Sequence, residues 1–260
     1  MSFLLVAFLG SITTYAAGPI IKNMGESKYC VQVGNVSMTI DAAAGAKILS
    51  YKYNDSEIIS QSPMREAFGS TFWTSPQREW NWPPVQEYDK DPYTVEQTSS
   101  SLIMTGQVSQ RFKYRIRKEF KADEKDNAIV ITYSIINESE ETRKVAPWEV
   151  TRVNNEGIIF FDAPSEAITP ANRIPFTQEY GVSWYKTDEG KANRKINADG
   201  KGWLAYCANN LLLVKKFDDL TASQPAPNEA EIQVYVNSGK TYIELENQGV
   251  YNELKPGESL

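Results

Sequence analysis

The stretch Phe112-Lys113-Tyr114-Arg115-Ile116-Arg117 alternates apolar and basic side chains with a period of two. Successive side chains of a β-strand point to opposite faces, so this stretch would turn its apolar groups toward a core and its basic groups away from it. Other β-branched or aromatic runs occur at 29–33, 36–40, 48–53, 102–107, 128–136, 202–207, 211–217, 232–236 and 241–245. The sequence therefore predicts a chain built mainly of strands.

Turn-forming residues separate these runs. They occur at Gly34-Asn35, Asn54-Asp55, 123–127, Asn209-Asn210 and 237–239. Glycine and asparagine tolerate the positive φ of tight reversals, so the pattern predicts consecutive antiparallel hairpins. No long window shows a helical face, and the best candidate for a short helix is 63–68. Because no repeat or linker divides the chain, we expect one all-β domain over residues 18–260.

Composition excludes several classes of function. The chain has 260 residues, a formal net charge of −6 and no histidine. Ser-His-Asp and Cys-His catalysis and His-ligated zinc are therefore excluded, which leaves carboxylates, Lys, Tyr and Arg to do any chemistry. The acidic balance argues against duplex nucleic acid as a partner. Without a phosphate-binding glycine loop, a CxxC pair or an EF-hand pattern, the sequence predicts no metal and no cofactor.

The N-terminal residues 1–17 have the form of a secretory signal. The run Phe3 to Leu9 is apolar, small and polar residues follow it, and no charged side chain precedes Lys22. This favours a secreted or periplasmic protein with no membrane span after cleavage, and a buried first strand or a membrane anchor are the weaker alternatives. Such a compartment allows one disulfide between Cys30 and Cys207, although two buried free thiols fit equally well.

The last residues, 254–260, have the form of a turn that leads into a strand. We therefore expect the final strand of the domain to be truncated in this sequence.

The segment 72–84 is rich in tryptophan, proline and polar side chains and lacks strand alternation. A loop of this kind can stack aromatic faces on a sugar ring while amides and a guanidinium bind its hydroxyls. The candidate sugar-binding residues here are Trp73, Gln77, Arg78, Trp80 and Trp82. The alternative is structural, with the tryptophans closing one end of a sandwich.

A second candidate stretch is 145–153, whose strand pattern places Trp148, Val150 and Arg152 on one face and Glu149 and Thr151 on the other. Burial beside aromatic rings would raise the pKa of a glutamate there and suit it to proton transfer. The alternative is a structural Glu149 paired with an arginine or a lysine.

A third stretch, 241–251, sets Tyr242, Glu244 and Glu246 on one strand face. Neighbouring glutamates repel each other, so solvent, a cation, a sugar or a basic neighbour must hold them there. The basic run 111–121 would suit a polyanion, but acidic residues follow it at once, so a solvated strand face is the better interpretation.

Several of these motifs together resemble galactose-mutarotase-like proteins. The segment Val36-Ser37-Met38-Thr39-Ile40-Asp41 followed by Gly45-Ala46-Lys47-Ile48-Leu49-Ser50-Tyr51 resembles their opening, in which a Gly-Ala/Gly-Arg-Ile-x-Ser-Leu signature follows the first hairpin. The likeness continues at Asn137, at 147–149 and at 244–246 before the turn at 256–259, and so spans about residues 30–260. It implies an antiparallel β-supersandwich with a concave sugar groove, in a secreted bacterial branch without the catalytic histidines.

The resemblance also implies roles for individual residues. Aldose epimerases open and reclose a hexose ring with histidines and a late glutamate, and only the glutamate has a match here, at Glu246. Trp148 or Glu149 lies about where those enzymes have a histidine, and Arg78 about where they have a sugar-contacting arginine. The resemblance predicts that Trp73, Arg78, Glu149, Arg152 and Glu246 converge on one groove.

Three interpretations of the function remain open at this point. One is a carbohydrate-active enzyme in which Glu149 and Glu246 act as acid and base and Arg78 or Arg152 stabilises a sugar oxygen. Another is a glycan-binding protein without catalysis, and an envelope protein without a ligand is a third possibility. The expected ligand is a mono- or oligosaccharide. The sequence identifies neither which sugar it is nor the oligomeric state of the protein.

Overall fold

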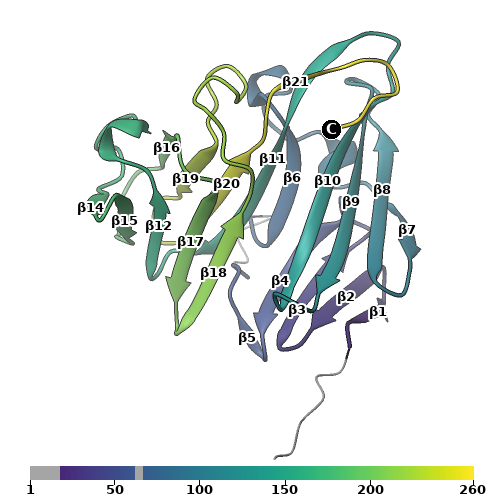
Figure 1. Cartoon of the computed structure of the whole chain (residues 1–260), viewed down its shortest axis with the longest axis horizontal. Helices are drawn as coiled ribbons and strands as arrows, with labels where there is room; N and C mark the ends of the chain where they lie inside the picture. Colours follow the sequence, from purple (N-terminus) through teal and green to yellow (C-terminus); the bar gives the residue numbers. More distant parts are fainter. Residues whose placement is uncertain (1–17, 62–66) are drawn as a thin grey trace, which may run out of the picture.

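The computed structural model describes residues 18–61 and 67–260. The predicted signal peptide, 1–17, and most of the predicted helix, 63–68, lie outside the described residues. The described residues form three sheets whose strand pairs are all antiparallel (Figure 1), which confirms the all-β prediction.

The large sheet crosses the whole molecule. Its main path has the order β1 (Ile20–Gly25), β2 (Lys28–Val33), β3 (Val36–Asp41), β4 (Lys47–Tyr53), β6 (Ser70–Ser75), β11 (Arg143–Asn154), β20 (Tyr242–Gln248), β19 (Ile232–Val236), β16 (Arg194–Ala198) and β13 (Ile168–Thr169), with β5 (Ser56–Glu57) beside β4 and β21 (Asn252–Leu254) beside β11.

Two smaller sheets complete the fold. One has the order β10 (Ala128–Asn137), β9 (Tyr114–Asp123), β8 (Ser101–Val108) and β7 (Thr94–Gln97), and the other β14 (Thr177–Glu179), β15 (Val182–Lys186), β12 (Ile158–Asp162), β17 (Trp203–Ala208) and β18 (Leu211–Lys216). In the described part of the chain, helix is limited to α1 (Gln86–Asp89) and the 3-10 turns η1 (Gln77–Glu79) and η2 (Ser165–Ala167).

The strands form where period-two patterns and turn residues predict them. The hairpins β2–β3, β9–β10 and β17–β18 reverse at the predicted turns. Gly34, Asn127, Asn209 and Asn210 have positive φ there, as these reversals require. Local sequence therefore accounts for these three hairpins.

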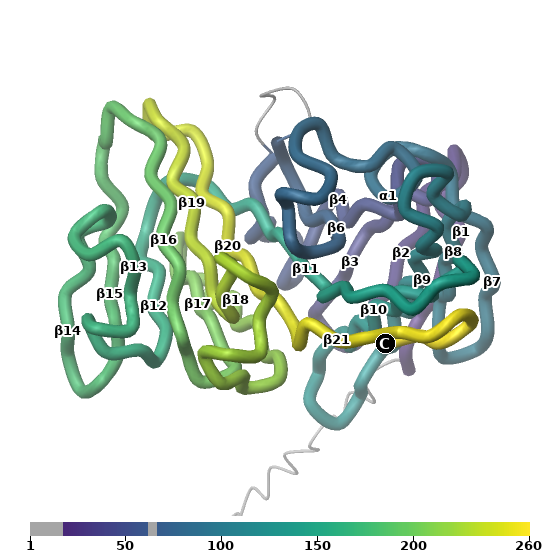
Figure 2. Tube along the Cα trace, turned by 90° about the horizontal axis from the view of Figure 1, so that it is seen from above, coloured from purple at the N-terminus to yellow at the C-terminus, as the bar shows by residue number. Residues whose placement is uncertain are grey.

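The two smaller sheets lie side by side on the same face of the large sheet (Figures 1 and 2). The four-stranded sheet packs on the half that contains β2 and β3, and there the rings of Phe72 and Tyr133 stack with centroids 4.2 Å apart. The five-stranded sheet covers the half around β20, where Lys215 on β18 donates a hydrogen bond to the carbonyl of Leu245. The main apolar core fills this interlayer space.

Strand β6 corrects one expectation. The tryptophan-rich segment was expected to be a loop from residue 72 onward, but Ser70–Ser75 is a central strand of the large sheet with all six residues buried. A strand covered on both faces needs no alternation of apolar and polar residues, so its sequence does not show the usual period. The loop begins only after Ser75.

Both cysteines are free thiols, Cys30 on β2 and Cys207 on β17. Each is partly buried rather than fully buried. Within the described ranges, no helix has the length and apolar character needed to cross a bilayer.

Lys118 corrects a second expectation. The basic run 111–121 was expected to be solvated, but Lys118 is only 1 % exposed, because it shares the inward face of β9 with Ile116 and Phe120. Its ammonium donates hydrogen bonds to the carbonyls of Gly45 at 2.6 Å and Ala46 at 3.2 Å. Burial lowers the pKa of Lys118 to about 7.

This buried lysine makes the stability depend on pH. Between its ordinary pKa of 10.5 and about 7, the unfolded chain carries the proton that the native state lacks. Stability therefore falls as pH decreases from 9.5 to 7, and we expect Lys118→Met to remove about 2–3 kcal/mol of that decrease. Urea unfolding of both proteins across this range measures the effect, and parallel curves would contradict it.

Candidate functional site

Strand β11 lies between β6 and β20, and its register decides which candidate residues share a face. Trp148 is opposite Trp73 on β6 and Gln248 on β20, and Arg152 is opposite Glu244. Glu246 is opposite Val150, so it also shares this face. We call this side of the large sheet, which faces away from the two smaller sheets, the outer face.

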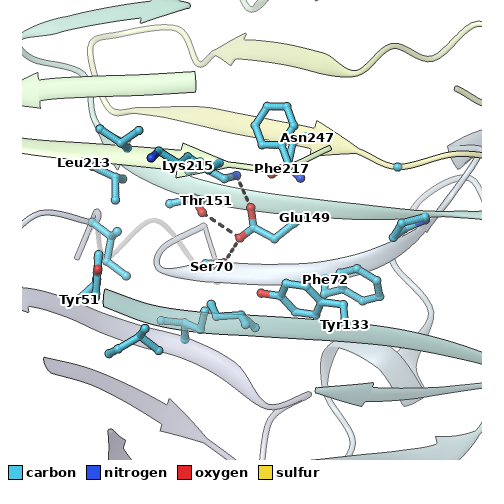
Figure 3. A pocket seen from close by; sticks show the side chains of 18 of the residues that line it. Tyr51, Ser70, Phe72, Tyr133, Glu149, Thr151, Leu213, Lys215, Phe217 and Asn247 are labelled. Atoms are coloured by element: carbon cyan, nitrogen blue, oxygen red, sulfur yellow. Dashed lines mark hydrogen bonds and ion pairs between the residues drawn. The ribbon is translucent and has the colours of Figure 1, made fainter. Parts of the chain in front are cut away.

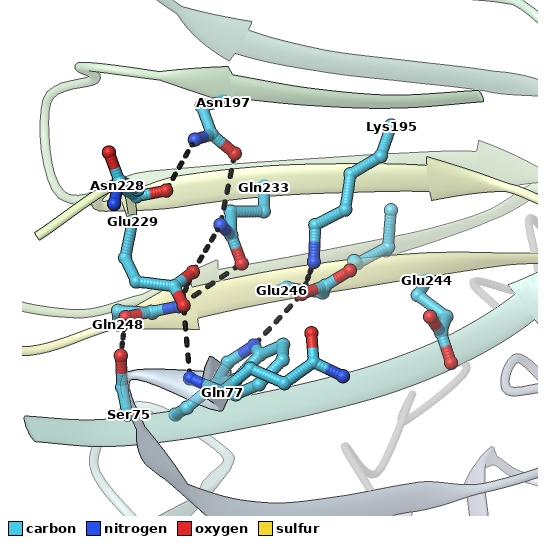
Figure 4. A network of polar contacts seen from close by, with 12 residues as sticks. Ser75, Gln77, Lys195, Asn197, Asn228, Glu229, Gln233, Glu244, Glu246 and Gln248 are labelled. Carbon is cyan, nitrogen blue, oxygen red and sulfur yellow. Dashed lines mark hydrogen bonds and ion pairs between the residues drawn. The ribbon is translucent and has the colours of Figure 1, made fainter. Parts of the chain in front are cut away.

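Glu246 lies at the centre of a polar cluster on the outer face (Figure 4). One carboxylate oxygen, Oε2, accepts hydrogen bonds from Trp148 Nε1 at 2.9 Å and from Lys195 Nζ at 2.8 Å. The other oxygen, Oε1, is buried and accepts no hydrogen bond from any residue that the structure describes. Burial raises the pKa of the Glu246 carboxyl above its ordinary value, while the positive charge of Lys195 acts in the opposite direction.

Arg152 and Glu244 form a second charged pair beside Glu246. The Arg152 Nε is 2.9 Å from Glu244 Oε1, and the guanidinium lies 5.6 Å from the centroid of the Trp73 ring. Arg152 Nη1 is buried and donates no hydrogen bond within residues 18–61 and 67–260. Among the described residues, this cluster thus includes an unsatisfied donor and an unsatisfied acceptor, whereas most buried polar groups in folded proteins have a partner.

Four of the six tryptophans pack together at this site. Trp73 contacts Trp80, Trp82 and Trp148 with ring centroids 5.7, 6.3 and 5.4 Å apart. Trp73 and Trp80 are each 5 % exposed, so they pack inside the protein as the structural alternative for this segment predicts. Trp82, in contrast, is 67 % exposed. Trp82 is therefore the tryptophan of this cluster that can stack on a ligand.

An amide network borders the cluster near η1 (Figure 4). Gln233 donates hydrogen bonds to Asn197 and Glu229, and Gln248 donates to Glu229 and Gln233. The backbone N–H of Gln77 donates to Glu229 at 3.1 Å, which ties the tryptophan-rich loop to the large sheet.

The two polar candidates on η1 differ in position. The side chain of Gln77 points toward Glu246 (Figure 4). Arg78 is exposed, and within the described chain its side chain makes no hydrogen bond to the Glu246 cluster. The structure therefore brings Gln77, but not Arg78, to the outer-face cluster.

Glu149 lies on the opposite face of the large sheet (Figure 3). It accepts hydrogen bonds from Ser70 and from Thr151, and it forms an ion pair with Lys215 on β18. A cavity of about 410 Å³ between the sheets lies next to it. The prediction that Glu149 and Glu246 act on one sugar is wrong, because adjacent positions of paired strands point to opposite faces. The structural alternative, a lysine-paired Glu149, is the one observed.

Sequence reasoning missed Lys195, Gln233 and Gln248. Lys195 alternates with the buried Ile196, which signals a strand, but nothing local indicates that β16 approaches β20 through β19. In the ranges that the structure describes, no group of three or more acidic or cysteine side chains is placed to hold a metal ion.

Comparisons with known proteins agree with this architecture. No family model and no curated protein sequence matches the chain. Among solved structures, a putative aldose 1-epimerase of Escherichia coli K12 is similar with a TM-score of 0.62 and 11 % identity, over 94 % of this chain and 96 % of that one. A galactose mutarotase-like protein of Lactobacillus casei has a TM-score of 0.57 and 11 % identity, over 94 % and 97 %. A TPR-domain containing protein of Parabacteroides distasonis has a TM-score of 0.65 and 13 % identity, over 90 % of this chain and 45 % of that chain.

The chain thus has the fold of galactose mutarotase-like proteins over nearly its whole length. The resemblance left Trp148 and Glu149 as alternatives for the position at which epimerases have a histidine. Of these two residues, Trp148 shares the face of Glu246 and contacts it. An indole N–H donates a hydrogen bond but does not exchange protons as a histidine does, so Trp148 can hold the glutamate but cannot serve as its acid or base.

Burial of Glu246 predicts a pH effect on stability. Because its pKa in the folded protein is raised, the unfolded chain loses this proton at a lower pH than the native state does. The group therefore destabilises the fold as pH rises above about 4.5. We expect the unfolding free energy of the wild type, relative to Glu246→Gln, to decrease between pH 4 and pH 7.

Urea denaturation at a series of pH values checks this effect. Glu253→Gln is the matched control, because that side chain is 69 % exposed. A difference between wild type and Glu246→Gln that stays constant or increases with pH would contradict the assignment.

Proposed function

We propose that the outer face around Glu246 binds carbohydrate and that the protein does so outside the cytoplasm, as residues 1–17 predict. The observation that carries the proposal is the pair of unsatisfied buried atoms, Glu246 Oε1 and Arg152 Nη1, next to a tryptophan cluster. A sugar hydroxyl both donates and accepts hydrogen bonds, so neighbouring hydroxyls can satisfy an acceptor and a donor together.

The charges of the site favour a neutral sugar. Two carboxylates, Glu244 and Glu246, are each paired with one cation, Arg152 and Lys195. No surplus positive charge remains within these two pairs, so an acidic glycan would gain little there. Exposed Trp82 supplies the flat apolar surface that the C–H face of a neutral sugar ring needs.

Access to Glu246 depends on Lys195. Glu246 itself is fully buried, whereas the Lys195 side chain is 34 % exposed and lies over the Trp148 ring, 4.9 Å from its centroid. Lysine is long and flexible, so a ligand hydroxyl can displace it and reach the carboxylate. Glu244, with its side chain 15 % exposed, is reachable without such a movement.

Catalysis is the second candidate function, and the contact between Lys195 and Glu246 favours it. These two groups are 2.8 Å apart, which is within the range for proton transfer, and burial raises the pKa of Glu246 above its ordinary value. Such an enzyme would use this pair in place of the glutamate and histidines of the epimerases. Binding without turnover is the simpler proposal, because Oε2 is already held by two donors.

Trp82→Ala tests the site with little risk to the fold, since the ring is mostly exposed. We expect affinity for a neutral saccharide, selected on a glycan array and then measured by calorimetry, to fall about 3- to 10-fold through loss of stacking. Tyr180→Ala, which removes a 95 % exposed aromatic ring from the turn between β14 and β15, is the matched control and should bind normally. Equal losses in both variants would contradict the proposal, as would no binding to any glycan.

Glu246→Gln separates binding from catalysis. For any saccharide that binds, we expect the variant to keep affinity within a few-fold, because glutamine still offers an acceptor and keeps nearly the same shape. Mass spectrometry and NMR of the saccharide then show whether the wild type changes it. A product that disappears with Glu246→Gln would establish the enzyme in place of the binding protein.

A further inference from the structure

Glu229 joins three separate elements through one carboxylate (Figure 4). Its Oε1 accepts a hydrogen bond from the backbone N–H of Gln77 at 3.1 Å. Its Oε2 accepts hydrogen bonds from the side-chain amides of Gln233 on β19 at 2.9 Å and Gln248 on β20 at 3.1 Å. Hydrogen bonds to a charged acceptor are stronger than those between neutral groups. The carboxylate therefore fixes the turn η1 to two neighbouring strands of the large sheet.

The segment that carries Glu229 is itself held in place. The backbone N–H of Glu229 donates a hydrogen bond to the carbonyl of Ala226 at 2.9 Å. Two residues further along the chain, buried Glu231 accepts hydrogen bonds from the backbone N–H groups of Gly202 at 2.8 Å and Leu220 at 3.0 Å. Glu229 thus approaches η1 from a fixed backbone, so the contact restricts the movement of η1.

The turn that presents Trp82 begins at Gln77. The carbonyl of Gln77 accepts hydrogen bonds from the backbone N–H groups of Trp80 at 3.2 Å and Asn81 at 2.7 Å. Asn81 has a positive φ of 59° and directly precedes Trp82, whose ring centroid lies 6.3 Å from that of Trp73. The position of the Trp82 ring therefore depends on the position of the Gln77 backbone.

The side chain of Gln77 depends on the same contact. It is partly exposed and points toward Glu246 (Figure 4). Its amide makes no hydrogen bond to any residue that the structure describes, so both the N–H₂ group and the oxygen are available to a ligand. The contact with Glu229 thus sets the place of two ligand-binding groups, one amide and one indole ring.

We propose that Glu229 is a positioning residue of the outer-face site, which holds η1 so that the Gln77 amide and the Trp82 ring meet the same saccharide. This inference rests on the proposed function, carbohydrate binding around Glu246. Both oxygens of Glu229 already accept hydrogen bonds, so it acts through Gln77 and not on the ligand. A loop that is ordered before binding raises affinity, because the ligand does not bear the entropic cost of ordering it.

Two other contacts keep the loop folded when the Glu229 contact is lost. Trp80 Nε1 donates a hydrogen bond to the carbonyl of Thr74 at 2.8 Å, and Arg111 Nη2 donates one to the carbonyl of Glu79 at 3.0 Å. Neither contact holds the Gln77 backbone. We therefore expect loss of the Glu229 contact to loosen the start of the turn without unfolding the domain.

Hydrogen exchange in Glu229→Met measures this loosening without any ligand. Methionine keeps the length of the side chain but removes both acceptor oxygens. We expect the amide of Gln77 to exchange at least about 10-fold faster, while the amides that pair β6 with β11 keep their rates. An unchanged rate at Gln77, or faster exchange throughout β6 and β11, would overturn the proposal.

Glu156→Met is the matched control for this variant. Glu156 is also partly buried, and its carboxylate accepts hydrogen bonds from two side-chain amides, those of Asn154 and Asn209. It lies just past the end of β11 that is far from η1. We expect Glu156→Met to leave both the exchange rate of Gln77 and saccharide binding unchanged, and an effect equal to that of Glu229→Met would refute a specific role for Glu229.

Saccharide binding in two backgrounds separates positioning from a general structural role. For a neutral saccharide that binds the wild type on a glycan array, we expect Glu229→Met to weaken binding about 3- to 10-fold. In a Gln77→Ala/Trp82→Ala background, which lacks both positioned groups, the same change should weaken binding less than about 2-fold. Equal losses in the two backgrounds would contradict this inference alone. No binding of the wild type to any glycan would overturn the proposed function and this inference with it.

Two variants of Gln77 remove the contact from the loop side. Gln77→Ala and Gln77→Pro both lack the side-chain amide, but only proline lacks the N–H that bonds to Glu229. Proline fits the first position of a helical turn, and Pro76 already has the extended ψ, 147°, that a following proline requires. We expect Gln77→Pro to bind the saccharide about 3-fold more weakly than Gln77→Ala, and the two to bind equally in the presence of Glu229→Met. Equal binding by the two single variants, or a difference that persists with Glu229→Met, would overturn the proposal.

Discussion

The burial of β11 on both of its faces is the constraint on which the rest of the structure depends. Eight of its twelve residues are buried, and these include Glu149 and Arg152, which point in opposite directions. A buried charge without a partner costs several kcal/mol, so each of them needs an opposite charge close by. Lys215 from the five-stranded sheet meets Glu149, and Glu244 from the neighbouring strand meets Arg152. These pairs require β18 and β20 to lie where they do.

Because successive side chains of β11 point to opposite faces, the two faces of the large sheet carry different groups of residues. The outer face carries aromatic rings, a buried glutamate and unsatisfied hydrogen-bonding atoms, which suit a small polar ligand. The inner face carries the Lys215–Glu149 ion pair and apolar side chains around a cavity of about 410 Å³. No residue of β11 can serve both sides, because each side chain points only one way.

The similarity to galactose mutarotase-like structures accounts for the arrangement of the strands but not for the side chains around Glu246. At identities of 11–13 %, what is common to these chains is the arrangement of strands. On that arrangement this protein has Trp148 and Lys195 around the late glutamate and contains no histidine. The donors that hold Glu246 are an indole and an ammonium, and its protonation depends on burial and on two neighbouring charges, those of Lys195 and Glu244.

The sequence by itself determined the local features of this protein. Alternation identified nearly all of the long strands, glycine and asparagine marked the hairpins, and the opposite orientation of Glu149 and Arg152 followed from their positions along β11. Those features depend on neighbours in the chain, which a single sequence displays.

Only the tertiary structure decided which of those faces carries the candidate site and which partners its charges find. The Trp148–Glu246 hydrogen bond joins residues 98 positions apart, Lys195 reaches Glu246 across β19, and Lys118 turns into the core although it lies in a basic run. A period of two places side chains on alternate faces of a strand without saying which face is covered or which strand lies beside it. Long-range strand pairing settles both, because it alone buries the apolar surface of three sheets and pairs the charges enclosed with it.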